Sequence, residues 1–254
     1  MKCIILAGGF AKRLWPLTLH QSKILIEING KPLLTYIMEK LDAIGGIDEI
    51  FISTNKRFEK DFENWLENNH FSKKIKLVVE PTTHEDEKFG AINAINYVVE
   101  QAKIEDDLMV LGGDNLDDLD IEEFIKFFKS KNAPITVVFD VGNRELAKKY
   151  GIVALDKDKI VDFVEKPEEP KSTLANTCKQ IFPKSTLHLF KEYLSSGNPK
   201  DAPGYFLQWL YKKTPVYAFI FKGHWFDVGC KESLHAAEEW VKGKKITSAL
   251  ISIR

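Results

Sequence analysis

The sequence predicts an α/β protein in which a mixed, mostly parallel sheet carries helices on both faces. Between residues 2 and 141, short apolar runs typical of buried strands alternate with segments whose apolar residues recur at helical spacing. A hydrophobic share of 44% and a charged share of 29% are ordinary for a globular chain and argue against disorder. Helices are the usual connections between parallel strands, so this alternation predicts a layered sheet rather than a bundle or a sandwich.

The first part of the chain supplies a regular series of elements. Strands are expected at residues 2–7, 49–54, 75–79, 108–111 and 135–141, and helices at 32–45, 58–66, 91–102 and 121–128. Pro32 suits the first turn of its helix, because a proline there removes no helical hydrogen bond. The helix at 121–128 has apolar residues at i, i+3, i+4 and i+7, and Asp120 precedes it as the expected N-cap.

The second part of the chain is less regular. Strands are expected at 151–155, 160–164 and 216–221, and helices near 185–195, 202–213 and 231–242. No stretch rich in glycine, serine and proline separates the two parts, and no internal repeat is present. We therefore expect one three-layer, Rossmann-like domain over residues 1–254.

The charge balance and the cysteines exclude several classes of protein. Lysine and arginine number 36 against 37 aspartates and glutamates, which gives no electrostatic support for nucleic acid or an anionic membrane as the main partner. Cys3, Cys178 and Cys230 form no CxxC pair, so neither a disulfide framework nor a structural zinc site is expected. No apolar run is long enough to span a bilayer or to act as a secretory signal, so a cytoplasmic location is expected.

The loop after the first strand is the first candidate for a binding site. Gly8 and Gly9 allow backbone N–H groups to close around an anion, and Lys12, Arg13 and Lys23 place cations in the same segment. A triphosphate cradle and a tight turn with solvated basic residues both fit this loop. Neither GxGxxG nor GxxxxGK[ST] occurs, so the two better-known phosphate loops are excluded.

Two aspartates follow predicted strands and are candidate metal ligands. Asp114 comes directly after the strand at 108–111 and its glycine pair, and Asp227 lies among apolar residues after the strand at 216–221. Mg²⁺ is usually held by one or two carboxylates together with phosphate oxygens, so such a pair suits it. Asp117 and Asp118 are expected to be solvated. Lys166, placed before a proline after a strand, would hold a second phosphate or be an exposed turn lysine.

Several motifs together resemble those of the sugar-1-phosphate nucleotidylyltransferases. The matching segments are Leu6–Thr18 with Ser22-Lys23, Gly112-Gly-Asp114, Tyr150-Gly-Ile-Val153, Glu165-Lys-Pro167 and Trp225-Phe-Asp-Val-Gly229, in the family's order across nearly the whole chain. Within that family the motifs are most similar to those of glucose-1-phosphate thymidylyltransferases. The resemblance implies a nucleotidyltransferase fold. It also implies a Mg²⁺-dependent reaction in which NTP and a sugar 1-phosphate give a nucleotide-sugar and pyrophosphate.

The resemblance also implies roles for individual residues. The nucleotide would contact Gly8, Gly9, Glu80 and Gly90; Arg13 and Lys23 would be catalytic contacts to the triphosphate; Asp114 and Asp227 would hold the metal; Gly151, Glu165 and Lys166 would contact the sugar phosphate. No hexapeptide repeat is present, so a C-terminal left-handed β-helix is not expected. The pattern is compatible with a homo-oligomer. Because a phosphate monoester is already mostly dianionic at pH 7, no general base is expected.

Four departures from the family pattern leave the base and the sugar open, and one of them is the stretch from Pro81 to Gly90, which is longer and more acidic than the family's usual glycine-containing nucleotide loop. Ala11-Lys12 stands where the family usually has Gly-Thr, Glu80 replaces a base-contacting glutamine, and Thr177-Cys-Lys-Gln180 replaces the Thr-Gly-x-Tyr of the sugar pocket. A carboxylate at residue 80 only accepts hydrogen bonds, which favours thymine, uracil or guanine over adenine.

Two rival functions stay open on the sequence alone. One is a glycosyltransferase that uses a nucleotide-sugar, because Asp118-Leu-Asp120 matches its short Asp-x-Asp metal motif. The other is a catalytically silent relative that binds nucleotide or sugar ligands.

Overall fold

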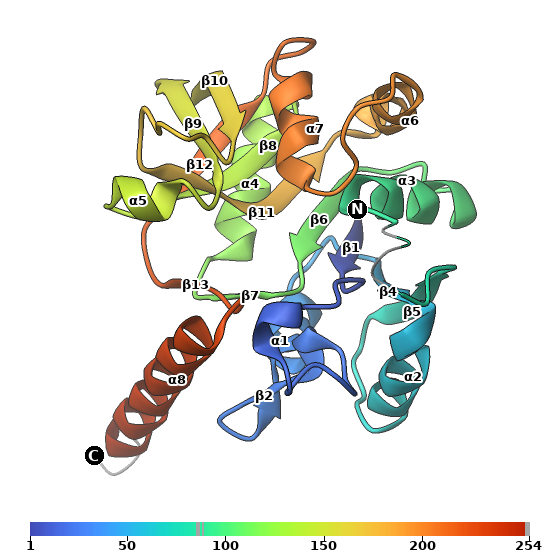
Figure 1. Cartoon of the computed structure of the whole chain (residues 1–254), viewed down its shortest axis with the longest axis vertical. Helices are drawn as coiled ribbons and strands as arrows, with labels where there is room; N and C mark the ends of the chain where they lie inside the picture. Colours follow the sequence, from blue (N-terminus) through green and yellow to red (C-terminus); the bar gives the residue numbers. More distant parts are fainter. Residues whose placement is uncertain (85–86, 88, 252–254) are drawn as a thin grey trace.

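The computed structural model describes residues 1–84, 87 and 89–251, with side chains as far as residue 243. Within them a nine-stranded sheet has the order β5-β4-β1-β6-β11-β8-β12-β10-β9 (Figure 1). Its strands are β1 (Lys2–Leu6), β4 (Glu49–Asn55), β5 (Lys74–Glu80), β6 (Leu108–Gly112), β8 (Ile135–Asp140), β9 (Gly151–Asp156), β10 (Lys159–Glu165), β11 (Leu174–Phe182) and β12 (Tyr217–Phe221). Every strand expected from the sequence is present.

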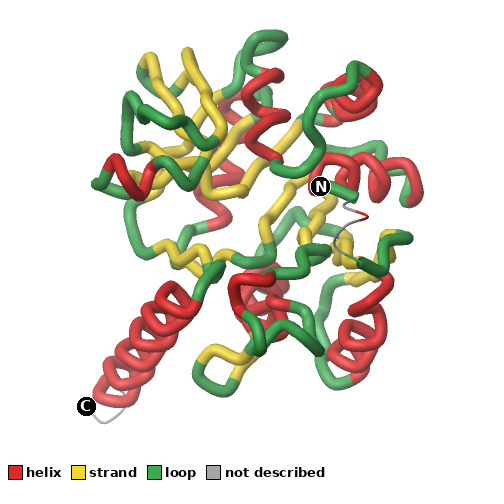
Figure 2. The backbone as a smooth tube through the Cα atoms, in the orientation of Figure 1, coloured by secondary structure: helices red, strands yellow, loops and turns green. Residues whose placement is uncertain are grey.

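Helices cover both faces of this sheet, which confirms the mixed α/β fold. They are α1 (Leu33–Asp42), α2 (Glu59–Glu67), α3 (Ala91–Gln101), α4 (Ile121–Lys131), α5 (Arg144–Ala147), α6 (His188–Ser195), α7 (Pro203–Leu210) and α8 (Lys231–Ile251). One core cluster joins the sheet to α1, α2 and α4, and the other joins it to α3, α6 and α7. Figure 2 shows the strands running through the middle of the molecule, with helices outside them.

The start of α4 is as expected from the sequence, and the start of α1 differs from the expectation. The Asp120 side chain accepts a hydrogen bond from the Glu123 backbone N–H at 3.0 Å, so Asp120 is the N-cap of α4 as expected. Helix α1 begins one residue later than expected, at Leu33, and Pro32 is its N-cap rather than part of its first turn.

Parallel pairing dominates the first part of the sheet. Strands β5, β4, β1 and β6 are parallel neighbours, and β8 is parallel to β12. Strand β11 lies between β6 and β8 and is antiparallel to both, and β10 is antiparallel to β9 and β12. The sequence analysis missed β11, because its middle residues Thr177-Cys-Lys-Gln180 interrupt any apolar run.

A small second ribbon brings two distant segments together beside the sheet. Strand β7 (Asn115–Asp117) pairs with β13 (Trp225–Asp227), and the register sets Asp227 opposite Asn115 (Figure 1). The Val228 backbone N–H also donates to the Asp114 carbonyl at 2.9 Å. These three-residue strands are too short for periodicity to indicate them, yet they place the two candidate metal ligands on one ribbon.

The described residues contain no membrane-spanning helix and no disulfide. None of the described helices is both long and apolar enough to cross a membrane. Cys3, Cys178 and Cys230 are all free thiols.

Candidate active site

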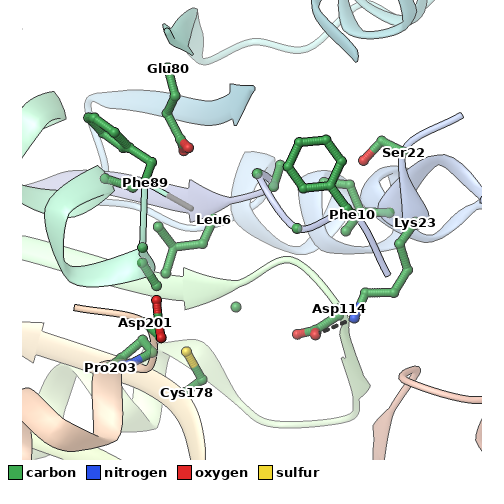
Figure 3. Close-up of a pocket in the computed structure, with 18 of the residues that line it drawn as sticks. Leu6, Phe10, Ser22, Lys23, Glu80, Phe89, Asp114, Cys178, Asp201 and Pro203 are labelled. Atoms are coloured by element: carbon green, nitrogen blue, oxygen red, sulfur yellow. Dashed lines mark hydrogen bonds and ion pairs between the residues drawn. The ribbon is translucent and has the colours of Figure 1, made fainter. Parts of the chain in front are cut away.

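A cavity of about 400 Å³ opens where β1 and β6 end. Six residues expected to act in nucleotide, triphosphate or metal binding line it: Gly8, Gly9, Lys23, Glu80, Gly90 and Asp114. Figure 3 shows Glu80 and Phe89 at one end of the cavity and the Lys23–Asp114 pair at the other. The parallel register sets Leu6 of β1 beside Gly112 of β6, and this is why the glycine loop and Asp114 meet at one edge of the sheet.

The glycine loop is held by its neighbours on two sides. The Gly113 backbone N–H donates to the Leu6 carbonyl at 3.0 Å, and the Asn55 side chain donates to the Gly8 carbonyl at 2.9 Å. A Cβ atom at Gly8 would lie 2.7 Å from Oε1 of Glu80, so any other residue there would require the Glu80 carboxylate to shift. Ala11 adopts φ 48°, a left-handed conformation that costs a residue with a side chain about 1–2 kcal/mol.

Lys23 and Asp114 form an ion pair across the cavity. Lys23 begins a 3₁₀ turn at Lys23–Leu25, and its Nζ lies 2.5 Å from Oδ2 of Asp114. Burial alone would raise the pKa of Asp114, but the charge and hydrogen bond of Lys23 outweigh burial and hold the pKa below its ordinary value. Asp114 is therefore a stable anion at neutral pH.

The pKa of Asp227 is shifted in the opposite direction from that of Asp114. Burial, and then the charge of Asp114, raise its pKa to about 6, although Lys23 and Arg13 act in the other direction. Within the described residues no hydrogen bond reaches its carboxylate. The two residues lie side by side, because the register sets Asp227 opposite Asn115 and the Val228 backbone N–H donates to the Asp114 carbonyl at 2.9 Å. An unpartnered carboxylate beside a second one is the arrangement that a bound cation would stabilise.

Two side chains orient Asp114 from behind. The Asn115 amide donates to Oδ1 of Asp114 at 2.8 Å, and the Trp225 indole N–H donates to Oδ1 of Asn115 at 2.5 Å. Neither role was expected from the sequence. Asn115 directly follows the candidate ligand, and that position was the only available signal.

Glu80 lies at the far end of the cavity and is almost fully buried, at 4% exposure. The Ser53 hydroxyl donates to Oε1 of Glu80 at 3.0 Å, and burial raises the pKa of the carboxyl. Phe89 and Thr82 line the same end of the cavity. Of the stretch 81–90, residues 85, 86 and 88 lie outside the described residues.

The residues expected at the sugar phosphate form a second group that does not line this cavity. A Cβ atom at Gly151 would lie 2.6 Å from Oε2 of Glu165, and one at Gly204 would clash with the same oxygen. Glu165 is thus enclosed by two glycines, and burial raises its pKa. Lys166 is exposed at φ 49°. Pro203, which precedes Gly204, lines the main cavity and links the two groups.

Arg13 also lies outside the lining of the cavity. Its side chain is exposed, and its positive charge acts to lower the pKa of Asp227.

The expectation that Asp117 is solvated is wrong. Its side chain is 5% exposed and forms ion pairs with Lys40 at 2.8 Å and Lys179 at 2.7 Å. Asp118 accepts a hydrogen bond from the His224 backbone N–H at 2.7 Å, and Asp120 caps α4. Neither Asp118 nor Asp120 lines the main cavity, so the structure gives the Asp-x-Asp reading no support.

Cys178 and Asp201 line the cavity as well, and neither was expected there. Cys178 interrupts the register of β11 and adopts φ 56°. Burial, followed by the charge of Asp114, raises the pKa of its thiol to about 12, so the thiol is neutral at physiological pH. Gln180, two residues later, is fully buried.

The opposite pKa shifts of the two aspartates predict opposite effects on stability. At pH 8, Asp227→Asn should raise the free energy of unfolding, because it removes a buried charge without a partner. Asp114→Asn should lower it, because Lys23 loses its anion. Urea unfolding of both variants measures these changes.

The pH dependence of the stability change in Asp227→Asn provides a second test of whether that change is a gain or a loss. The folded-state pKa of Asp227 is about 6, above the ordinary 3.8, so the cost of its ionised form is present above pH 6 and is relieved as the pH falls. The gain from Asp227→Asn should therefore shrink by about 1 kcal/mol between pH 8 and pH 5. A gain that is equal at both pH values, or a loss at pH 8, would contradict this account.

Comparison with known proteins identifies the family. The family model described as "Nucleotidyl transferase" matches residues 2–243. A UTP–glucose-1-phosphate uridylyltransferase of Synechocystis is 30% identical over 90% of this chain and 60% of its own length. A mannose-1-phosphate guanyltransferase of Candida albicans is 29% identical over 90% of this chain and 61% of its own length.

A solved structure agrees in fold. A "putative glucose-1-phosphate thymidylyltransferase" from Bacillus anthracis, in complex with a sucrose, superposes with a TM-score of 0.81 at 25% identity, covering 94% of each chain. The chain spans 55–61% of the length of the curated relatives it matches. The family resemblance of the motifs is confirmed, and the chain belongs to the nucleotidyl transferase family.

Proposed function

We propose that the protein transfers a nucleoside monophosphate from NTP to a sugar 1-phosphate and releases pyrophosphate. One observation carries the proposal: a lysine and two aspartates converge beside a glycine loop at the edge of a cavity. The similar proteins are named for thymidylyl, uridylyl and guanylyl transfer to glucose or mannose 1-phosphate. Glucose 1-phosphate with dTTP or UTP is the pair that the motifs favour.

The chemistry needs cations more than it needs a base. A phosphate oxygen of the sugar 1-phosphate would attack the α-phosphorus of the NTP, form a new P–O bond and expel pyrophosphate. Because this phosphate is largely dianionic at neutral pH, no proton has to be removed first. The difficulty is that two polyanions must approach each other, so positioning and neutralisation of charge provide most of the catalysis.

Asp114 and Asp227 fit a divalent ion of the Mg²⁺ type. No group of three or more histidine, cysteine, aspartate or glutamate side chains around a common point occurs within the described residues, which disfavours a site enclosed by protein ligands alone. Mg²⁺ instead accepts one or two carboxylates and completes its shell with phosphate oxygens and water. When bound, the ion would neutralise charge on the phosphates, and the unpartnered Asp227 carboxylate would gain a partner.

The remaining roles follow from position. Lys23 would leave Asp114 and contact the α-phosphate, while Gly8 and Gly9 would present backbone N–H groups to the phosphates. Arg13, which is exposed, would contact the β- and γ-phosphates. Gly90 would contact the nucleotide from the α3 side, where its φ of 85° and the adjacent Lys200 carbonyl leave no room for a side chain.

Glu80 would read the base, and the enclosed Glu165 would read the sugar. The Glu80 carboxylate accepts hydrogen bonds, which suits the N3–H of thymine and uracil or the N1–H and N2–H of guanine. Glu165, with Gly151 and Lys166, would contact sugar hydroxyls and the sugar phosphate. This assignment supports pyrimidine or guanine over adenine.

The first experiment measures pyrophosphate release from dTTP, UTP, GTP, CTP and ATP with a panel of sugar 1-phosphates, with and without Mg²⁺. We expect metal-dependent release, fastest with dTTP or UTP and glucose 1-phosphate. Fastest release with GTP and mannose 1-phosphate would keep the reaction and change the substrates. Consumption of a nucleotide-sugar with release of nucleoside diphosphate, and no pyrophosphate from any pair, would refute the proposal.

Two lysines should separate catalysis from sugar binding. Lys23→Ala should lower kcat at least about a hundredfold, the scale of a lost transition-state contact. Lys166→Ala should chiefly raise KM for the sugar phosphate and change kcat little. Steady-state kinetics with each substrate varied in turn measure both effects. Near-normal turnover in Lys23→Ala would remove Lys23 from the mechanism, and an unchanged KM in Lys166→Ala would make that lysine a surface residue.

Glu80→Gln should change the preference among bases. The glutamine offers an N–H donor that the carboxylate lacks, so it can pair with a carbonyl of uracil or thymine in addition to the N3–H. We expect the ratio of kcat/KM for UTP to that for GTP to rise about tenfold, the scale of one gained and one lost hydrogen bond. Glu87→Gln, at an exposed carboxylate nearby, is the matched control. An unchanged ratio in both variants would show that Glu80 does not contact the base.

A further inference from the structure

A buried ion pair and a third, half-buried charge lie next to the candidate metal ligands, and the proposed reaction gives them no role. Lys179 of β11 and Asp117 of β7 have side chains only 8% and 5% exposed, and their Nζ and Oδ2 atoms are 2.7 Å apart. Lys40 of α1 binds the other carboxylate oxygen at 2.8 Å and the Asp117 carbonyl at 3.2 Å. The Leu119 backbone N–H also donates to Oδ1 of Asp117 at 3.0 Å.

Stability does not explain this group. Burying a lysine and an aspartate costs several kcal/mol of desolvation per ion, and well-packed apolar residues at such positions are often as stable or more so. The alternating pattern of β11 predicts an apolar side chain at residue 179, because its neighbour on the same face, Ile181, belongs to the core cluster on the side of α1 and α4. A buried ion pair at this place therefore needs another reason.

The position of β7 supplies a reason for the buried ion pair between Lys179 and Asp117. This strand has a single strand partner, β13, and two strands alone are only marginally stable. Asp114 directly precedes β7, and Asp227 lies opposite Asn115 in the register. A movement of β7 against β13 would change the separation of the two candidate metal ligands, and a movement of the whole ribbon would shift both ligands away from Lys23 and the cavity. Leu116 packs in an apolar cluster with Leu33 of α1, and Asp117, at the far end of β7, forms the ion pairs that join β7 to α1 and to β11.

Empty space beside the Asp117 carboxylate makes its ion pairs with Lys40 and Lys179 necessary for holding it in place. A cavity of about 30 Å³ adjoins it, lined by Tyr36, Lys40, Asn115, Asp117 and Lys179 among others. Packing alone would not hold Asp117 in place, because the carboxylate could turn into this space once a lysine is lost.

We propose that Lys179 is a positioning residue for the metal site: by binding Asp117 it fixes β7, and so holds Asp114 where it can share one divalent ion with Asp227. This inference rests on the proposed function, because it assumes that the two aspartates bind the ion that accompanies the nucleotide. Lys179 would contact neither the ion nor the substrates. It would act through Asp117 and the rest of β7, which Asp114 directly precedes.

The test compares metal binding with stability in four variants. Lys179→Met removes the charge, and Lys179→Arg keeps it. Asp117→Asn with Lys179→Met removes the ion pair altogether, and Lys131→Met is the control, because Lys131 pairs with Asp158 away from the site. Calorimetric titration with Mn²⁺ in the presence of UTP, and separately of GTP, reports metal affinity without turnover. Thermal unfolding reports stability.

We expect Lys179→Met to weaken Mn²⁺ binding at least about tenfold, as loss of an outer-shell partner does, and Lys179→Arg to restore most of it. The variant without the pair should regain thermal stability, because no unpaired buried charge is left, but it should not regain metal affinity. Lys131→Met should bind Mn²⁺ normally. If Lys179→Met fails to fold, the variant without the pair still decides the question.

The direction of the change in Mn²⁺ affinity in Lys179→Met distinguishes a positioning role of Lys179 from a simple charge effect. The Lys179 charge acts on both Asp114 and Asp227, and at pH 8 both carboxylates are ionised with or without it. By charge alone, loss of Lys179 would therefore remove a repulsion of the metal cation and tighten Mn²⁺ binding at pH 8. Tighter or unchanged binding in Lys179→Met, or normal affinity in the variant without the pair, would overturn the inference. So would a wild-type chain that binds no Mn²⁺ with either nucleotide.

The outcome can be separated from that of the proposed function. Pyrophosphate release by the wild-type chain, with normal metal affinity in the Lys179 variants, would reject this inference alone. Weak metal binding in the variants, without turnover of any substrate pair by the wild-type chain, would reject the function and keep the inference.

Discussion

The ion pair between Lys23 and Asp114 is the interaction on which the candidate site depends. It joins the loop that follows β1 to the end of β6, two parallel neighbours whose register already sets Leu6 beside Gly112. The pair keeps Asp114 ionised despite burial, and it holds Lys23 at the edge of the cavity. Each partner is then in place for a different part of a metal–nucleotide complex, the lysine for a phosphate and the aspartate for the cation.

Other parts of the fold position Asp227 and orient the Asp114 carboxylate, which the Lys23–Asp114 pair does not do. The short β7–β13 ribbon brings Asp227 beside Asp114, and the Trp225–Asn115 hydrogen bond orients the Asp114 carboxylate. The two aspartates differ because only Asp114 has a lysine partner. A site with one satisfied and one unsatisfied carboxylate is less stable than it could be, which is common where binding energy is needed for a ligand.

Apolar periodicity was enough to predict the layered sheet, because β1, β4, β6 and β8 each contain a run of three or more consecutive apolar residues. Periodicity could not indicate β11, where the polar residues Thr177, Lys179 and Gln180 occupy buried positions of the central sheet. Asp117 was misjudged for a related reason, since its partners Lys40 and Lys179 are distant in sequence. Partners of this kind are set by strand order, which the sequence alone does not show.

Two residues at positions where the family pattern has glycine also escaped sequence reasoning. Ala11 and Cys178 both have positive φ, in the two segments that border the nucleotide cavity and the metal site. The residue types gave no sign of left-handed backbone, because only the family pattern marks these positions as glycine. Ala11 and Cys178 thus adopt a left-handed backbone although neither is a glycine. Strain of this size persists only where the surrounding structure fixes the conformation.

The most direct measurement is a crystal structure of the chain with a non-hydrolysable UTP analogue and Mg²⁺, and a second with the corresponding GTP analogue. The account predicts that Lys23 leaves Asp114 and contacts a phosphate oxygen, while one metal ion lies between Asp114 and Asp227. A complex in which Lys23 stays on Asp114 and the phosphates lie outside the cavity would contradict it.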